Sequence, residues 1–173
     1  MRGVRTNTPP DQELGAGENA AGRRPFDGFE QFYREAWPGA FRLASFLTQD
    51  PSAAEEIAQD AFARMYTGWG SAANPHAYLR VTLVNRCHNW RRHARAQQAR
   101  LPLLLTVASA ELAFDELADA VAALPFRQRA VLVLRYHLRL SETEIADALG
   151  CRPGTVKSLS SRALARLHKE IQP

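Results

Sequence analysis

The chain has 173 residues, of which 46% are hydrophobic, and it carries a formal net charge of +4. This length allows one domain or two small ones, and the apolar fraction is sufficient for real cores. Strand-like alternation is absent, so we predict an all-α protein. The mild basic excess is compatible with a polyanionic partner. No stretch approaches the roughly 20 apolar residues that a membrane span needs, which excludes such a span.

The N-terminal region changes character near residue 26. Residues 1–25 are rich in Gly, Pro, Asn, Thr and Arg and lack the apolar run of a signal peptide, so we expect a disordered extension and a cytoplasmic protein. From Asp27 the pattern is helical, and Pro38 predicts a kink or two abutting helices. The apolar face of this segment comprises Phe29, Phe32, Tyr33, Ala36, Ala40, Leu43, Ala44 and Leu47.

A second helix is predicted after Asp50, with Pro51 in its first turn. Its apolar stripe comprises Ala54, Ile57, Ala58, Ala61, Phe62 and Met65. Away from this stripe lie Glu55, Glu56, Gln59 and Asp60. Such a polar side is either a solvated face, which is the default for an amphipathic helix, or a docking surface for a basic partner.

The segment TGWGSAANP, residues 67–75, is predicted as a loop that precedes a third helix over about 75–95. In this helix we expect Tyr78, Val81 and Val84 to face inward. The outward positions are expected to be Thr82, Asn85, Asn89 and Arg92. The end of the helix, WRRHARAQQAR, is strongly basic. The aromatic residues of this region, Trp69, Tyr78 and Trp90, are either core residues or platforms on which unpaired bases stack.

Residues 101–110, LPLLLTVASA, are interpreted as a linker, and a helix is expected over 111–123. Pro125 begins the next helix, in which Val131, Leu134 and Leu138 should face inward. The cations Arg127, Arg129 and Arg135 are expected to be available to phosphates.

Residues 140–168 form the most informative stretch, because they predict a helix-turn-helix. Ser141 and Glu144 have the spacing of a capping box, Gly150 suits a helix end, and Pro153 suits the first turn of the next helix. Inward positions are Ile145, Ala148 and Leu149 in the first helix and Val156, Leu159, Ala163 and Leu167 in the second. The outer side then carries hydroxyls and cations suited to phosphates and base edges, namely Thr155, Lys157, Ser158, Ser161 and Arg162.

Cysteine and histidine usage argues against a metal site and against an enzyme. Cys87 and Cys151 fall in different predicted helical units, which favours two reduced thiols. No Cys/His pair has the spacing of a zinc site, and no nucleophile–base or paired-carboxylate arrangement emerges. We therefore predict no metal, no cofactor and no catalytic residue.

Four blocks of the sequence together resemble the extracytoplasmic-function sigma factors of bacterial RNA polymerase. They are DPSAAEEIAQDAFARMY and NPHAYLRVTLVNRCHNWRR in the first half, then LPFRQRAVLVLRYHLRLSETEIADALG and GTVKSLSSRALARL in the second. The pair Trp37 and Pro38 and the ending SRALARL resemble the sigma-E-like actinobacterial subgroup. The resemblance implies sigma domain 2 over residues 26–98, a flexible linker over 99–111, and sigma domain 4 over 112–173, after an extension over 1–25.

The resemblance also implies a role for each surface, and it favours docking for the acidic face. Contacts with the clamp helices of the polymerase largest subunit fall on Glu55, Glu56, Gln59, Asp60 and Phe62. Contacts with the minus-ten element fall on Trp69, Ser71, Asn74, His76, Asn85, Asn89, Trp90, Arg91 and Arg92. Contacts with the minus-thirty-five element fall on Arg127, Arg152, Thr155, Lys157, Ser158, Ser161 and Arg162. The sequence departs from the family at Leu159, where a polar residue is common, so one base contact is expected to be lost or the helix rotated.

These implications define a promoter-specificity factor whose partners are core RNA polymerase, including the flap of its β subunit, and promoter DNA. An anti-sigma factor is a further possible partner, and a membrane is not expected. In the free protein the two domains are expected to pack together or to bind an inhibitor. The alternative function is a helix-turn-helix repressor that binds a palindromic site as a homodimer without polymerase.

Overall fold

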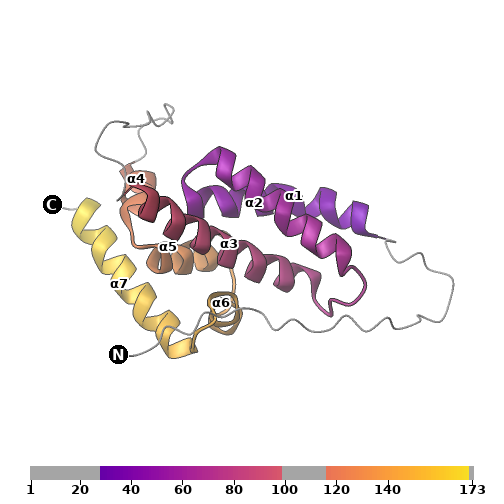
Figure 1. The fold of residues 1–173 in the computed structure, drawn as a ribbon. Helices are drawn as coiled ribbons and strands as arrows, with labels where there is room; N and C mark the ends of the chain where they lie inside the picture. Colours follow the sequence, from indigo (N-terminus) through magenta and orange to yellow (C-terminus); the bar gives the residue numbers. More distant parts are fainter. Residues whose placement is uncertain (1–27, 99–115, 172–173) are drawn as a thin grey trace, which may run out of the picture.

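The computed structural model describes residues 28–98 and 116–171, so the predicted N-terminal extension and linker lie outside the described residues. Within these two ranges every regular element is a helix, which confirms the all-α prediction (Figure 1). None of the helices in these ranges is long and apolar enough to cross a membrane. The division into domains stays a prediction, because its linker falls outside the described ranges.

The first bundle consists of α1 (Phe29–Thr48), α2 (Pro51–Thr67) and α3 (Pro75–Gln98), which pack against one another. Helix α1 continues through Pro38, so the expectation of two abutting helices is wrong. Pro38 is exposed, which places its ring and the interrupted backbone hydrogen bond on the solvent side.

Local signals set the start of α2 as predicted. The Asp50 carboxylate accepts a hydrogen bond from the backbone N–H of Ala53 at 3.0 Å, and Pro51 occupies the first turn. All six residues of the predicted apolar stripe of α2 are buried. The stripe is the surface through which α2 contacts α1 and α3, since apolar burial is the main favourable term in such packing.

The predicted orientation of α3 is wrong in part. Tyr78 is 44% exposed, whereas the buried positions of this helix are Leu79, Leu83, Val84 and Cys87. Thr82 and Asn85, expected to face solvent, are half-buried. The physical reason is that α3 has neighbours on more than one side, since it packs on α1, α2 and α6.

The second bundle consists of α4 (Glu116–Ala123), α5 (Phe126–Leu132), α6 (Glu142–Leu149) and α7 (Pro153–Ile171). Helix α5 continues directly into a short π-helix, η1 (Val133–His137). The long helix α7 packs across α4, α5 and α6. It lies at the edge of the molecule away from α1 and α2 (Figure 1).

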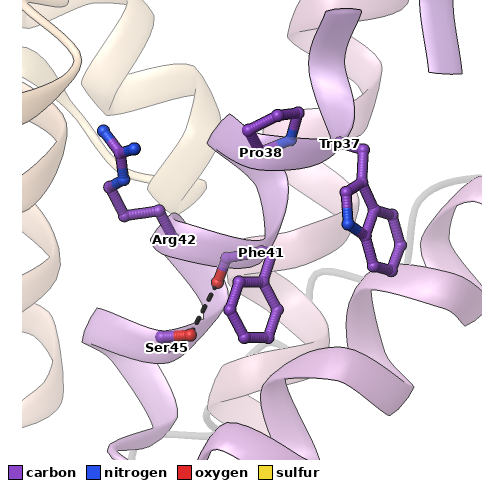
Figure 2. Close-up of a pocket in the computed structure, with 5 residues that line it drawn as sticks. All are labelled: Trp37, Pro38, Phe41, Arg42 and Ser45. Carbon is purple, nitrogen blue, oxygen red and sulfur yellow. Dashed lines mark hydrogen bonds between the residues drawn. The ribbon is translucent and has the colours of Figure 1, made fainter. Parts of the chain in front are cut away.

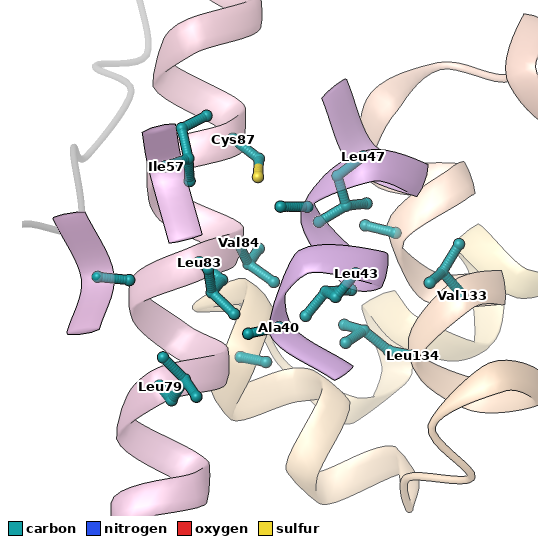
Figure 3. Close-up of a cluster of buried hydrophobic side chains, with 14 of the residues drawn as sticks. Ala40, Leu43, Leu47, Ile57, Leu79, Leu83, Val84, Cys87, Val133 and Leu134 are labelled. Atoms are coloured by element: carbon teal, nitrogen blue, oxygen red, sulfur yellow. The ribbon is translucent and has the colours of Figure 1, made fainter. Parts of the chain in front are cut away.

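The two bundles share one core. Leu43 and Leu47 of α1 lie between Val84 and Cys87 of α3 and the η1 side chains of Val133 and Leu134 (Figure 3). At the periphery, Arg80 of α3 forms an ion pair with Glu144 of α6 at 3.5 Å. The expected packing of the two domains in the free protein is therefore present in this structure.

Candidate nucleic-acid interface

The turn between α6 and α7 is built by the local signals that the sequence predicted. The Ser141 hydroxyl accepts a hydrogen bond from the backbone N–H of Glu144 at 3.3 Å, and the Glu144 carboxylate accepts one from the backbone N–H of Ser141 at 3.0 Å. The backbone N–H of Ser141, together with its hydroxyl, which donates to the carboxylate at 2.7 Å, stabilises the ionised form and lowers the pKa of Glu144. Gly150 ends α6 in the left-handed conformation, with φ of 56°, and Pro153 begins α7. The helix-turn-helix geometry is thus confirmed.

Helix α7 separates an apolar face from a polar one. The four predicted inward residues of α7 are buried. Leu159 is 8% exposed and belongs to this inner face, so it does not replace a polar residue on the outer face. The outer side carries six exposed residues that the sequence predicted there or in the preceding turn, namely Arg152, Thr155, Lys157, Ser158, Ser161 and Arg162.

Some outer residues of α7 already interact with neighbours. Arg162 donates to the backbone carbonyl and to the hydroxyl of Ser158, at 3.1 and 3.3 Å. Lys157 lies 3.7 Å from the carboxylate of Glu142 in an ion pair, yet its side chain is 71% exposed. These contacts orient both cations without burying them.

The three arginines of the α5 region have different environments, and the predicted availability of Arg129 is wrong. Arg127 is exposed and donates to the Leu149 carbonyl at 3.1 Å. Arg129 is fully buried and donates to the carbonyls of Ala122 and Leu47, at 2.7 and 3.0 Å. Because no solvent-accessible surface remains, Arg129 cannot meet a phosphate in this arrangement. Arg135 is half-buried and forms an ion pair with Glu142 at 2.6 Å.

The loop between α2 and α3 is anchored by Trp69. Its ring lies 5.1 Å from that of Phe29 and 5.2 Å from that of Phe32, and it packs against the core while remaining half-buried. In the same loop, the Asn74 side chain accepts from the Ala77 N–H at 3.0 Å, and Ser71 donates to the Gly68 carbonyl at 2.7 Å. The core interpretation of Trp69 is therefore favoured in this structure, and the polar loop residues shape the loop and cap α3.

The C-terminal half of α3 presents cations beside a packed tryptophan. Trp90 is half-buried against the core, while Asn89 and Arg92 are exposed. Arg91 donates to the Thr48 carbonyl at 3.2 Å and to the Gln49 side chain at 2.9 Å, at the C-terminal end of α1. At the other end of α3, His76 is exposed with its ring 4.9 Å from Phe32.

The acidic face of α2 is mostly available, with two exceptions. Glu55, Glu56 and Gln59 are exposed. Asp60 forms ion pairs with Arg64 and with Arg86 of α3, so its charge is already compensated. Phe62 does not belong to this surface, because it is 2% exposed and its ring packs on Phe32, Tyr33 and Trp37.

A shallow pocket on α1 was not anticipated from the sequence. It has a volume of about 490 Å³ and is lined by Trp37, Pro38, Phe41, Arg42 and Ser45, as Figure 2 shows. The Trp37 and Phe41 rings are stacked with a centroid distance of 6.4 Å. The i, i+4 spacing of these two aromatic residues was the available signal.

No group of cysteine, histidine and carboxylate side chains in the described ranges could hold a metal ion. Cys87 and Cys151 are both free thiols. Burial raises the pKa of the Cys87 thiol to about 12, so this sulfur stays protonated near neutral pH.

Comparisons with known proteins define the class. The description "Sigma-70 region 2" matches residues 32–97, and "Sigma-70, region 4" matches residues 114–167. An RNA polymerase sigma-E factor of Streptomyces antibioticus is 36% identical over 83% of this chain and 84% of its own length. The ECF RNA polymerase sigma factor SigM of Mycobacterium tuberculosis is 32% identical over 91% of this chain and 82% of its own.

A solved structure agrees with these matches. The sigma factor RpoE of Bartonella quintana, crystallised with the anti-sigma factor NepR, has a TM-score of 0.69 and 25% identity, covering 83% of this chain and 96% of that one. A two-bundle helical protein with these regions is a transcription initiation factor of the sigma-70 type.

More narrowly, the chain belongs to the extracytoplasmic-function sigma factors and is similar to the actinobacterial sigma-E group. It is an alternative sigma factor that acts with core RNA polymerase on promoter DNA. This membership disfavours a repressor that acts without polymerase.

Proposed function

We propose that this sigma factor uses three surfaces in initiation, two that bind promoter DNA and one that binds polymerase. The outer face of α7 reads the minus-thirty-five duplex, the loop after α2 and the C-terminal half of α3 hold the minus-ten element, and the acidic face of α2 docks on the polymerase clamp. The observation that carries this proposal is α7, whose six outer and turn residues are exposed while its inner face is buried. That separation suits a helix placed in a major groove.

On α7, charge and hydroxyl groups have separate roles. Lys157 and Arg162 supply cations for phosphate oxygens or for the acceptors of guanine, and Thr155 and Ser161 supply hydroxyls for base edges. Arg127, exposed at the start of α5, is suited to a backbone phosphate near the same groove. Arg129 and Arg135 are excluded from this set by their internal partners.

Of the five predicted polymerase contacts, we propose that Glu55 and Glu56, with Gln59 beside them, bind the polymerase clamp. Both carboxylates are exposed, and Gln59 donates to Glu55 at 3.2 Å. Asp60 acts instead by tying α2 to Arg86 of α3, and Phe62 supports the helix from inside the core. The partner surface is expected to be basic, since charge complementarity sets orientation and association rate.

For the minus-ten element, Asn89 and Arg92 are the exposed members of the predicted set in the C-terminal half of α3. Trp69, Ser71 and Asn74 of the loop, with His76 in the first turn of α3, would receive an extruded base. Extruding a base costs a few kcal/mol, and stacking on an aromatic ring returns about 1–3 kcal/mol. One pocket thus roughly balances the cost, and phosphate contacts from Arg92 must supply the remainder. Use of the Trp69 ring requires the loop to expose it further than here.

The remaining assignments follow from this role. The protein has no catalytic site of its own, works in the cytoplasm where polymerase acts, and its linker and second domain engage the active-site cleft and the β flap. Polymerase separates the two bundles to the spacing of the two promoter elements. An anti-sigma factor is proposed as a regulator, because the similar RpoE structure was solved with one.

The test is in vitro transcription with purified core polymerase on a genomic fragment library. Transcript starts that appear only with this protein and share two spaced elements support the role. DNA binding without polymerase and without new starts contradicts it.

Lysine variants then test α7, because Lys157 and Lys169 are the only lysines and both are exposed on this helix. Lys157→Ala should weaken promoter binding and reduce the salt slope by about one, whereas Lys169→Ala leaves the slope unchanged. For docking, Glu55→Lys with Glu56→Lys should weaken polymerase binding more than Glu35→Lys, an exposed glutamate of α1. Equal effects within either pair would contradict the assignment.

A further inference from the structure

The junction between α3 and α5 contains a second pocket, two of whose lining arginines belong to the predicted minus-ten contacts. Its volume is about 200 Å³, and its lining residues are His88, Arg91, Arg92 and Phe126. The first three come from α3 of the first bundle, and Phe126 begins α5 of the second. The His88 and Phe126 rings lie 5.1 Å apart. The pocket therefore has walls from both bundles and is complete only while they are packed together.

The electrostatic environment of this pocket is positive. Burial lowers the pKa of His88, and the nearby charges of Arg127 and Arg92 lower it further. Within the described ranges, neither Arg92 nor Arg127 has a carboxylate partner, in contrast to Arg34, Arg64, Arg80, Arg86 and Arg135. Two guanidinium charges that act on the same imidazole and have no carboxylate partner among the described residues attract an anion.

The geometry of the arginines is partly fixed in advance. Arg91 is held at the end of α1 by the Thr48 carbonyl and the Gln49 side chain, and Arg127 is held by the Leu149 carbonyl. Held guanidinium groups lose less conformational entropy on binding, and their planar donors match phosphate oxygens. The volume of about 200 Å³ corresponds to about seven water molecules at about 30 Å³ each, which is room for one or two phosphoryl groups.

We propose that this pocket binds a small anion carrying a phosphate or pyrophosphate group, and that the bound anion stabilises the packed arrangement of the two bundles. Arg91 and Arg92 contact the anion from the first bundle, and His88 donates from the pocket wall. Arg127 of the second bundle does not line the pocket, but its charge acts on His88 and adds longer-range attraction for the anion. A ligand that binds only the packed form shifts the population toward that form. It therefore opposes the separation on polymerase, a consequence that rests on the proposed function.

The direct test is thermal unfolding of the full chain, without DNA or polymerase, during titration with pyrophosphate. Sodium chloride at equal ionic strength is the reference. We expect Tm to rise with the logarithm of the pyrophosphate concentration above the Kd, because ligand at 100 times its Kd favours the folded state about 100-fold. A rise no larger than that with chloride overturns the proposal.

Three single variants locate the site. Arg92→Gln and Arg127→Gln each remove one cation from a different bundle and should weaken pyrophosphate binding at least tenfold. Arg166→Gln removes the same charge from an exposed position on α7 and should leave the Kd within twofold. An equal loss in all three variants would indicate a general effect of net charge and would overturn the site.

The same phosphate chemistry could be supplied by the DNA backbone, so a short duplex without promoter elements is titrated in parallel. If the duplex raises Tm above the chloride reference and pyrophosphate does not, the site serves DNA and the small-anion proposal fails. Small-angle scattering adds an independent readout of the size of the protein in solution. Pyrophosphate should shift this size toward that of the packed arrangement of the two bundles. Since none of these assays contains polymerase, their failure is distinguishable from failure of the transcription assay.

Discussion

Replacing Arg129 with Met should destabilise the contact between the two bundles more than any exposed arginine variant does. The guanidinium is 0% exposed. One of its bonds, to the Ala122 carbonyl at 2.7 Å, lies within the second bundle. The other, to the Leu47 carbonyl at 3.0 Å, crosses to the first bundle. The substitution therefore removes one bond from a domain and one from the interface.

The magnitude follows from these two bonds. A hydrogen bond from a charged donor contributes about 1.5–3 kcal/mol. The Met side chain fills much of the vacated volume and carries no charge that must be desolvated, which offsets part of the loss. We expect a net loss of about 3 kcal/mol in the free energy of unfolding. Arg127→Met is the matched control, because Arg127 is exposed with one 3.1 Å bond, and its loss should stay below about 1 kcal/mol.

The chain provides two separate probes for this measurement. All three tryptophans, Trp37, Trp69 and Trp90, lie in the first bundle, so their fluorescence reports that bundle alone. Far-UV ellipticity reports both bundles. In urea the wild-type transitions should coincide because the core is shared, whereas in Arg129→Met the ellipticity should begin to fall at lower urea. Two results together would refute this expectation: free energies of unfolding of Arg129→Met and Arg127→Met that differ by less than about 1 kcal/mol, and coincident transitions by the two probes in Arg129→Met.

Three further predictions concern single side chains. Ser141→Ala should cost about 1 kcal/mol at pH 7 through loss of the cap. Because the pKa of Glu144 is lowered in the folded state, its contribution is present above the unfolded pKa of about 4.3 and is lost as pH falls through the lower folded pKa. The difference in urea midpoint between wild type and Ser141→Ala should therefore shrink at acid pH to the part due to the hydrogen bond that the Ser141 hydroxyl accepts from the Glu144 N–H. Cys151 should react with a thiol reagent at pH 8 while Cys87, with its pKa raised to about 12, reacts only on unfolding; equal labelling rates would contradict this. Trp69→Ala should lower the stability of the first bundle by about 2 kcal/mol through lost contacts with Phe29 and Phe32, and Trp69→Phe should recover most of it in the same urea experiment.

The elements predicted best are those set by local chemistry. The cap at Asp50, the capping box at Ser141 and Glu144, and the left-handed Gly150 each depend on residues within three or four positions, so the sequence displays them directly. The outer face of α7 followed from the same short-range periodicity. These features account for the helix-turn-helix, which carries the family resemblance.

The features predicted worst depend on partners distant in sequence. Arg129 reads as one of several surface cations, and only the fold brings it to Leu47, 82 residues away. A single apolar stripe predicts that Tyr78 faces inward, but α3 packs on helices of both bundles and Tyr78 is exposed. Phe62 matched a docking position by sequence, and only the aromatic cluster around it shows that it is buried.

The chemistry of the Arg129 contact bears on how the bundles can separate. A purely apolar interface would expose all of its buried surface to water, at about 25 cal/mol for each Å². A buried guanidinium contributes less net stability, because its desolvation cancels much of the hydrogen-bond energy. On separation Arg129 regains its hydration, while the Leu47 carbonyl keeps a second donor, Arg91, at 3.4 Å. Neither partner is left both buried and unsatisfied. The Arg129 contact thus specifies one packed arrangement in the free protein and adds little to the cost of separation, most of which comes from exposing the apolar core that both bundles share.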